Sequence, residues 1–164
     1  GDVYKRQVVV CAEKEGRIMG FSSYTLDAAH QMAVYRKHRL ALAFGALPSL
    51  IRRPSLIKLL WQRYRSTAPD STFRFVSSSG TRGEYWAWDA RYKDPISSVE
   101  LDEIAHCILY TLGNDEVFFE VDTINKDILR YHKLNKAEEL ERLTLPDGRE
   151  RVLMKYNLKE RYKR

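Results

Sequence analysis

Apolar and aromatic segments predict β-strands in the first and middle parts of the chain. Residues 8–13 begin with an apolar run, residues 17–26 form the second segment, and the Glu15-Gly16 pair between them is typical of a tight hairpin turn. Residues 84–92 (EYWAWDARY) are rich in aromatic strand formers and alternate in part. These segments predict a hairpin followed, further along the chain, by another strand.

Four further segments predict strands. Residues 116–122 form a mostly apolar run, as in a strand that is buried on both faces. Residues 140–145 and 149–158 flank Pro146-Asp147-Gly148 and predict a last hairpin. The alternating positions of its second strand are Val152, Met154, Tyr156 and Leu158. A short strand is also expected at residues 73–77.

Helical spacing of apolar residues predicts two helices in the second half of the chain. The first covers residues 98–112 and ends at Gly113, because glycine commonly stops a helix. Its apolar face is expected to consist of Leu101, Ile104, Ala105, Ile108 and Leu112. A short helix over residues 125–135 follows the apolar strand.

The segment between the first hairpin and the strand at 84–92 predicts more helices. Two or three short helices are expected, one at about 28–46 and another at about 55–66. Pro48 and Pro54 should interrupt them, because proline lacks a backbone donor and clashes with the preceding turn.

The order of elements predicts an α+β fold, in which helices pack on a mixed sheet. The chain of 164 residues is long enough for one ordinary domain. We assign this domain to residues 8–164, with a basic helical insert at 28–66. Residues 1–7 (GDVYKRQ) resemble the translated end of a sequencing adapter, as found at the edges of metagenomic fragments, and we exclude them from the predicted domain.

Charge is unevenly placed along the chain, whose formal net charge is +6. Residues 28–69 contain no acidic residue, and their basic residues are Arg36, Lys37, Arg39, Arg52, Arg53, Lys58, Arg63 and Arg65. Three interpretations stay open: a solvated basic face, an element on an anionic membrane or phosphate-bearing partner, or a subunit interface in an oligomer. Nucleic acid is not expected, because the aromatic residues are not interleaved as in a stacking platform.

Cysteine usage favours a reducing compartment. Cys11 and Cys107 fall in an apolar strand and on an apolar helix face, where buried free thiols are expected. We therefore expect a cytoplasmic protein, peripheral to the membrane if the basic insert binds lipid. The four histidines have no carboxylate or thiol partners at ligand spacing, so no metal site is predicted.

Three stretches resemble the GNAT superfamily of N-acyltransferases. The hairpin EGRIMGF closes on the family's glycine-aromatic pair, and RRPSLIKLLWQRYR is similar to an insert of GNAT members from glycan biosynthesis. In NKDILRYHKLNKA, the residues that occupy positions of a GNAT subtype pattern are Asn125, Ile128, Tyr131, His132 and Ala137, with Lys136 where a glycine is usual. The resemblance implies a GNAT-like fold without its first strand and first two helices.

The reaction that this resemblance implies is acyl transfer from acetyl-CoA to the amine of a small molecule, such as an amino sugar. The strands at 84–92 and 116–122 would part and offer backbone groups to the pantetheine arm. A base takes the proton of the amine, and an acid near the sulfur protonates the leaving thiolate. By position, Glu84 is the candidate base and Tyr131 or His132 is the candidate acid.

The loop that would hold the pyrophosphate departs from the family pattern. Residues 91–100 (RYKDPISSVE) contain no glycine, and Pro95 has no N–H to offer. Ser97 and Glu100 predict a capping box at the helix start, with Asp102 in the first turn. The residues that would contact acetyl-CoA by position are Ala90, Arg91, Tyr92, Lys93, Ile96, Ser97, Ser98 and Asn125. The alternative is a catalytically degenerate GNAT-like domain that acts in binding or as a scaffold, at a membrane surface through its basic insert.

Overall fold

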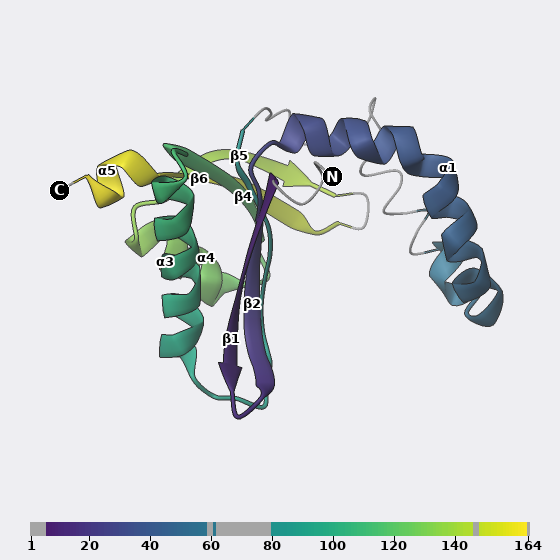
Figure 1. Cartoon of the computed structure of the whole chain (residues 1–164), viewed down its shortest axis with the longest axis horizontal. Helices are drawn as coiled ribbons and strands as arrows, with labels where there is room; N and C mark the ends of the chain where they lie inside the picture. Colours follow the sequence, from purple (N-terminus) through teal and green to yellow (C-terminus); the bar gives the residue numbers. More distant parts are fainter. Residues whose placement is uncertain (1–5, 59–60, 62–79, 146–147, 164) are drawn as a thin grey trace.

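The computed structural model describes residues 6–58, 61, 80–145 and 148–163. Within these ranges, the strands are β1 (Gln7–Lys14), β2 (Arg17–Thr25), β3 (Arg82–Trp88), β4 (Glu116–Asp122), β5 (Glu138–Thr144) and β6 (Glu150–Asn157). The helices are α1 (Ala28–Arg52), α3 (Pro95–Thr111), α4 (Lys126–Leu134) and α5 (Leu158–Tyr162), and residues 55–58 are also helical. The strands form one mixed sheet in the order β1-β2-β3-β4-β6-β5, so the predicted α+β fold is confirmed (Figure 1).

The first hairpin forms as predicted. β1 and β2 pair antiparallel over their whole length, and the turn residues Glu15 and Gly16 have φ values of 52° and 74°. Arg6 forms an ion pair with Asp27 at 3.0 Å, and β1 begins at Gln7, one residue before the predicted domain boundary. β1 forms one edge of the sheet.

The neighbouring strands β3 and β4 part from each other. They are parallel, and their register contains a single pair, Arg82 opposite Phe118, whereas β4 pairs with β6 along its whole length. The sequence predicted a strand that ends at Tyr92, but β3 ends at Trp88. The Asp89 carboxylate accepts a hydrogen bond from the backbone N–H of Arg91 at 2.9 Å, and this local bond turns the chain out of the sheet.

α3 begins three residues earlier than predicted. Its N-cap is Asp94, whose Oδ1 accepts a hydrogen bond from the backbone N–H of Ser97 at 3.0 Å, and Pro95 occupies the first helical position. The predicted capping box of Ser97 and Glu100 is therefore wrong, because an aspartate followed by proline is itself a strong helix start. Asp102 consequently lies about two turns inside the helix and not in its first turn.

α3 buries a different face from the predicted one. Leu101 and Ala105 are buried as expected, but the other predicted positions, Ile104, Ile108 and Leu112, are 37–56% exposed. The buried face instead includes Asp102, His106 and Leu109. Two polar residues in the buried stripe make it less apolar than the solvent side, so apolar spacing alone indicates the wrong face.

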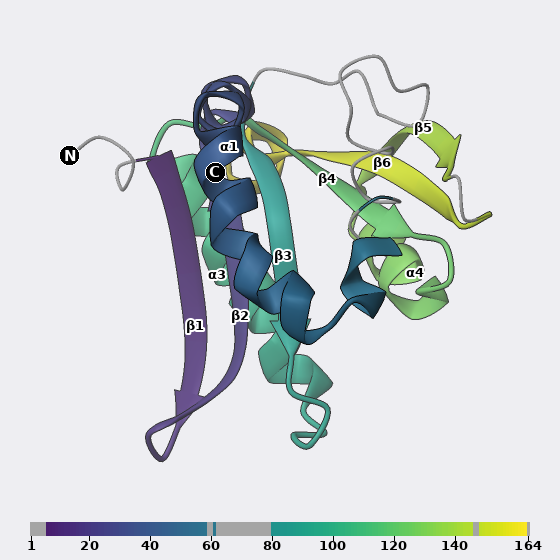
Figure 2. The ribbon, with the colours of Figure 1, turned by 90° about the vertical axis from the view of Figure 1, so that its right-hand side faces the viewer.

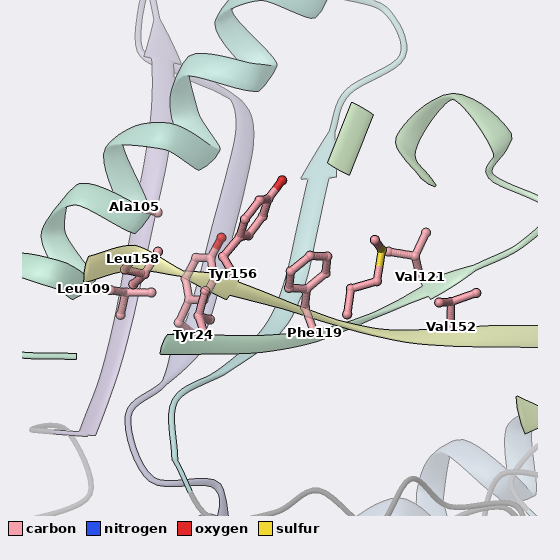
Figure 3. Packing of buried hydrophobic residues seen from close by; sticks show 10 residues of the cluster. Tyr24, Ala105, Leu109, Phe119, Val121, Val152, Tyr156 and Leu158 are labelled. Atoms are coloured by element: carbon pink, nitrogen blue, oxygen red, sulfur yellow. The ribbon is translucent and has the colours of Figure 1, made fainter. Parts of the chain in front are cut away.

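The hydrophobic core lies where the sheet meets α3, and β4 and β6 supply most of it (Figure 3). The predicted alternation in β6 is confirmed, since its expected core residues Val152, Met154 and Tyr156, and Leu158 directly after it, are at most 2% exposed. β4 has the predicted bounds, but it is not buried on both faces as predicted. Its residues alternate between buried and half-buried, so only one face is fully buried. Figure 3 shows the hydroxyl groups of Tyr24 and Tyr156 pointing in the same direction from their strands.

α1 projects from the sheet on the side opposite α3 (Figures 1 and 2). It runs for 25 residues and continues through Pro48, so the predicted interruption there is wrong, whereas Pro54 does follow the end of the helix at Arg52 and its C-cap residue Arg53. An internal proline removes one hydrogen bond, but the surrounding turns retain theirs. Ala28 is the buried residue of this helix. The strand predicted at 73–77 and most of the helix predicted at 55–66 lie outside the described residues.

Both cysteines are free and exposed, so the expectation of buried thiols is wrong. Cys11 lies on the edge strand β1 and Cys107 lies on the outer side of α3. The expectation of a reducing compartment rested on buried thiols, so the exposure of both cysteines removes its support. Within the described residues, no helix has the length and hydropathy needed to cross a membrane.

Candidate functional site

A pocket of about 270 Å³ opens where β3 and β4 part. Strand β3 contributes Glu84, Trp86 and Trp88, and β4 contributes Phe119, Glu120, Val121 and Asp122. Helix α3 adds Ser98, Asp102 and His106, and α4 with its N-cap adds Asn125, Ile128 and His132. Two diverging strands and the helices that follow them thus form one site from segments far apart in the sequence.

Carboxylates are prominent on the pocket wall. Glu120 forms ion pairs with Arg82 and with Arg151, and Asp122 pairs with an arginine of the last hairpin. Glu84 has no ion-pair partner among the described residues. Among the carboxylates that β3 and β4 contribute to the wall, the charge of Glu84 is therefore not compensated by a direct partner in the described part of the chain.

The pKa of Glu84 lies above its ordinary value. Burial is the main cause, since removal from water disfavours the charged form. The positive charge of Arg82 lowers the pKa, and the negative charge of Glu120 raises it further. A carboxyl group with a raised pKa accepts a proton more readily near neutral pH. This property suits a general base.

A buried polar cluster lies at the base of the pocket. The Tyr24 hydroxyl donates to Asp102 Oδ1 at 2.5 Å and lies 3.2 Å from His106 Nε2, while Ser22 donates to the same hydroxyl at 3.1 Å. All four residues are at most 4% exposed. Burial raises the pKa of Asp102, against the effect of the Tyr24 hydrogen bond, and lowers the pKa of His106 to about 4. His106 is therefore neutral at pH 7.

Three buried polar atoms in the pocket wall have no hydrogen-bond partner among the described residues. They are Trp86 Nε1, Asp102 Oδ2 and His106 Nδ1, and the last two lie 3.8 Å apart. Buried polar atoms in proteins nearly always have a partner. Leaving these atoms without a partner costs the folded protein free energy.

The two candidate acids on α4 point to different surroundings. His132 lines the pocket, and its Nδ1 lies 2.9 Å from the Tyr156 hydroxyl. Burial lowers the pKa of His132 to about 4, so the ring is neutral at pH 7. Tyr131 instead donates a hydrogen bond to Glu103 of α3 at 3.1 Å, and burial raises the pKa of its hydroxyl. Tyr131 thus links the two helices and is not among the residues that line the pocket.

The predicted cofactor residues divide into two groups. Ser98 and Asn125 line the pocket together with Glu84 and His132. The others, Ala90, Arg91, Tyr92, Lys93, Ile96 and Ser97, belong to the turn after β3 and the first turn of α3. The fold thus brings the candidate base and one candidate acid together with two of the predicted cofactor residues.

The N-terminus of α3 does not resemble a phosphate cradle. The Asp94 carboxylate occupies the N–H of Ser97, and Pro95 has no N–H. Arg91 is bound to Asp89 through a bidentate ion pair at the surface. A negative charge at the helix start competes with an anionic ligand for the same donors.

Sequence reasoning missed the buried cluster of Ser22, Tyr24, Asp102 and His106, and also Tyr156. One signal was present: Asp102 and His106 are four residues apart on one helix, between apolar positions that point the same way. Nothing local indicates that Tyr24, about 80 residues earlier, supplies their partner.

No protein-family profile matches this chain, and no curated protein matches it. Solved structures do match. A protein from Desulfovibrio desulfuricans assigned to the GNAT acetyltransferase family superposes with a TM-score of 0.58 at 9% identity, over 94% of this chain and 70% of that one. FeeM, an N-acyl amino acid synthase from uncultured soil microbes, gives 0.57 at 10% identity, over 96% and 76%. The NatC complex bound to Gag peptide and CoA gives 0.53 at 10% identity, over 92% and 70%. The chain therefore has the GNAT fold, as its sequence resemblance implied.

Proposed function

We propose that the pocket between β3 and β4 transfers an acyl group from a thioester, acetyl-CoA in the simplest case, to the amine of a small molecule. The observation that carries this proposal is Glu84, an unpaired carboxylate with a raised pKa on the wall of the pocket. The GNAT fold supports the reaction class, because proteins of this fold include an N-acyl amino acid synthase and a complex solved with CoA.

The acidic wall favours an amine as the acceptor. An amine reaches the pocket mainly as an ammonium ion, and the carboxylate of Glu84, which has no ion-pair partner among the described residues, attracts a cation. Glu84 then takes one proton, directly or through a water, and leaves the neutral amine that can attack the thioester carbonyl. An amino sugar is one acceptor of this class, since its hydroxyl groups can also donate to carboxylates.

His132 is the better candidate for the acid. As the new C–N bond forms and the C–S bond breaks, the nitrogen loses its second proton to the neutral His132 ring, and the imidazolium formed in this way gives that proton to the departing sulfur. We assign Tyr131 a positioning role, because its bond to Glu103 holds α4 against α3.

The residues present fit the acyl end of the donor better than its nucleotide. Ser98 and Asn125 lie in the pocket and can bond to the pantetheine arm. Asp94 disfavours phosphate at the start of α3, so we expect Lys93, with Arg91 beside it, to contact the pyrophosphate as point charges. When bound, acetyl-CoA supplies the activated acyl group.

Replacing the candidate base tests the reaction. Glu84→Gln should lower kcat by about 10²- to 10⁴-fold at pH 7, because the amine would lose its proton acceptor. The rate is followed by thiol release from acetyl-CoA with a panel of amines that includes amino sugars. Glu100→Gln, an exposed change on α3 outside the pocket, serves as the matched control. Equal rates for Glu84→Gln and the parent protein would rule out this role.

Binding of the donor is measured separately by calorimetry. Acetyl-CoA should bind in the micromolar range and more weakly to Lys93→Glu, whereas acetyl-pantetheine, which lacks both the pyrophosphate and the nucleotide, should bind equally to both proteins. Absence of binding by folded protein would favour the alternative, a GNAT-like binding or scaffold domain without catalysis.

A further inference from the structure

α1 carries an apolar stretch that the described part of the chain leaves uncovered. Residues 40–51 (LALAFGALPSLI) contain no charged residue, and every position over residues 35–45 is exposed. Its bulky residues at helical spacing, Leu40, Phe44, Leu47 and Ile51, are 45–79% exposed. Figures 1 and 2 show this helix extending away from the sheet. An apolar stripe therefore faces solvent.

Both ends of this stretch are basic. Arg36, Lys37 and Arg39 precede it, and Arg52 and Arg53 follow it. None of these five cations has an ion-pair partner among the described residues, and residues 28–69 contain no acidic residue at all. The helix thus combines bare apolar surface with uncompensated positive charge.

We propose that α1 binds the surface of an anionic lipid bilayer, with its apolar stripe among the acyl chains and its cations at the headgroups. The stretch at residues 40–51 is about 18 Å long as a helix, against roughly 30 Å for the hydrocarbon layer. It is too short to cross the layer and long enough to lie within the interface. Arginine and lysine side chains can reach back from such a position to the headgroup phosphates.

Charge and patterning favour lipid over protein as the occupant. A second copy of α1 would bring five cations against five others without a carboxylate between them. An amphipathic helix that fills a protein groove normally presents a charged face to water. Here the positions beside the stripe, Ala41, Ala43, Gly45, Ala46 and Ser49, are small and uncharged. The whole stretch therefore suits an apolar medium with anions at its boundary.

The proposed membrane contact is separate from the acyl-transfer pocket. No residue of α1 is among those that line the pocket. Failure of either proposal thus leaves the other standing.

Vesicle co-sedimentation of the whole chain tests the charge requirement. The protein should bind vesicles of phosphatidylcholine mixed with phosphatidylglycerol, less so as salt rises, and should not bind phosphatidylcholine alone. Arg36→Gln with Arg39→Gln should weaken binding about thirtyfold, the change expected for two cations near an anionic surface. The control Lys14→Gln with Arg17→Gln removes equal charge at the far turn of the β1–β2 hairpin and should bind as the parent does. Equal binding to both kinds of vesicle, or equal loss in the control, would overturn the proposal.

A second pair of changes tests the apolar contact without altering charge. Leu40→Ser with Phe44→Ser should weaken vesicle binding more than tenfold. Both side chains are more than 60% exposed, so the urea midpoint should not change, which shows that the variant is folded. Unchanged vesicle binding would refute insertion. A concentration-dependent dimer of the parent protein that this variant abolishes would instead assign the stripe to a second copy.

Discussion

At the scale of single residues, the most informative feature is a buried carboxylate with one satisfied oxygen. Asp102 Oδ1 accepts from Tyr24, but Oδ2 has no partner among the described residues and faces a histidine that burial keeps neutral. Such an arrangement is costly for folding.

Removing the Tyr24 hydroxyl should destabilise the protein. In Tyr24→Phe, the hydrogen bond that remains to Asp102 Oδ1 is the one from Ser22 Oγ, at 3.4 Å. The substitution should lower the free energy of unfolding by about 1–3 kcal/mol. Urea denaturation measures the change. Tyr85→Phe, at a tyrosine that is 59% exposed, is the control and should have little effect. Equal stability of the two variants would contradict the assigned hydrogen bond.

Stability should fall on acidification through the buried histidines. Burial lowers the pKa values of His106 and His132 from 6.5 to about 4, so the unfolded chain binds protons at a higher pH than the folded one. Their contribution is complete above about pH 6.5 and is lost as the pH falls toward 4. Asp102 opposes this trend, because its raised pKa lets the folded state hold a proton at a higher pH than the unfolded chain does.

A histidine variant isolates this effect. His106→Gln should flatten the fall in unfolding free energy between about pH 6.5 and pH 4, measured by urea denaturation across that range. His30→Gln, at an exposed histidine of α1, should keep the parent slope. An unchanged slope in His106→Gln would show that this ring does not couple protonation to folding.

At the scale of elements, local chemistry decided boundaries that apolar spacing did not. Asp94 and Pro95 start α3, and Asp89 ends β3, each through a short-range bond or a fixed backbone angle.

The glycine of the glycine-aromatic pair in β2 is required by the packing of the strands. A Cβ on Gly20 would lie 2.3 Å from the Trp88 ring and 2.8 Å from the Ala87 carbonyl oxygen, so β2 and β3 meet too closely there for any side chain.

Two glycine substitutions should therefore act in opposite directions. Gly20→Ala should destabilise the protein by about 1–3 kcal/mol, because the strands must move apart. Gly45→Ala, in α1 with nothing within 4 Å of the added Cβ, should raise the stability of that helix by about 0.5–1 kcal/mol. Thermal unfolding and helix content by circular dichroism measure the two effects. A tolerated Gly20→Ala would contradict the close strand approach.

At the scale of the whole molecule, α1 and the sheet differ in how firmly they are held. β4 and β6 are buried in the core, whereas α1 contributes Ala28 to it. Hydrogen exchange followed by mass spectrometry should show faster exchange over residues 35–45 than in β4 and β6, because local opening of α1 exposes little apolar surface. Anionic vesicles should slow exchange in α1 and leave the strands unchanged. Equal protection of both regions without lipid would contradict this difference.

The sequence by itself determined the strands of the sheet, most of the helices and the turn positions Glu15-Gly16 and Gly113, because periodicity and turn chemistry are local properties. Resemblance supplied Glu84 and His132, and the structure brings both to one pocket. Only the tertiary structure decided which face of α3 is buried, where the strands part and that Tyr24 meets Asp102. These features depend on contacts between segments far apart in the sequence, such as Arg82 with Phe118 and Tyr24 with Asp102, and no local pattern encodes them.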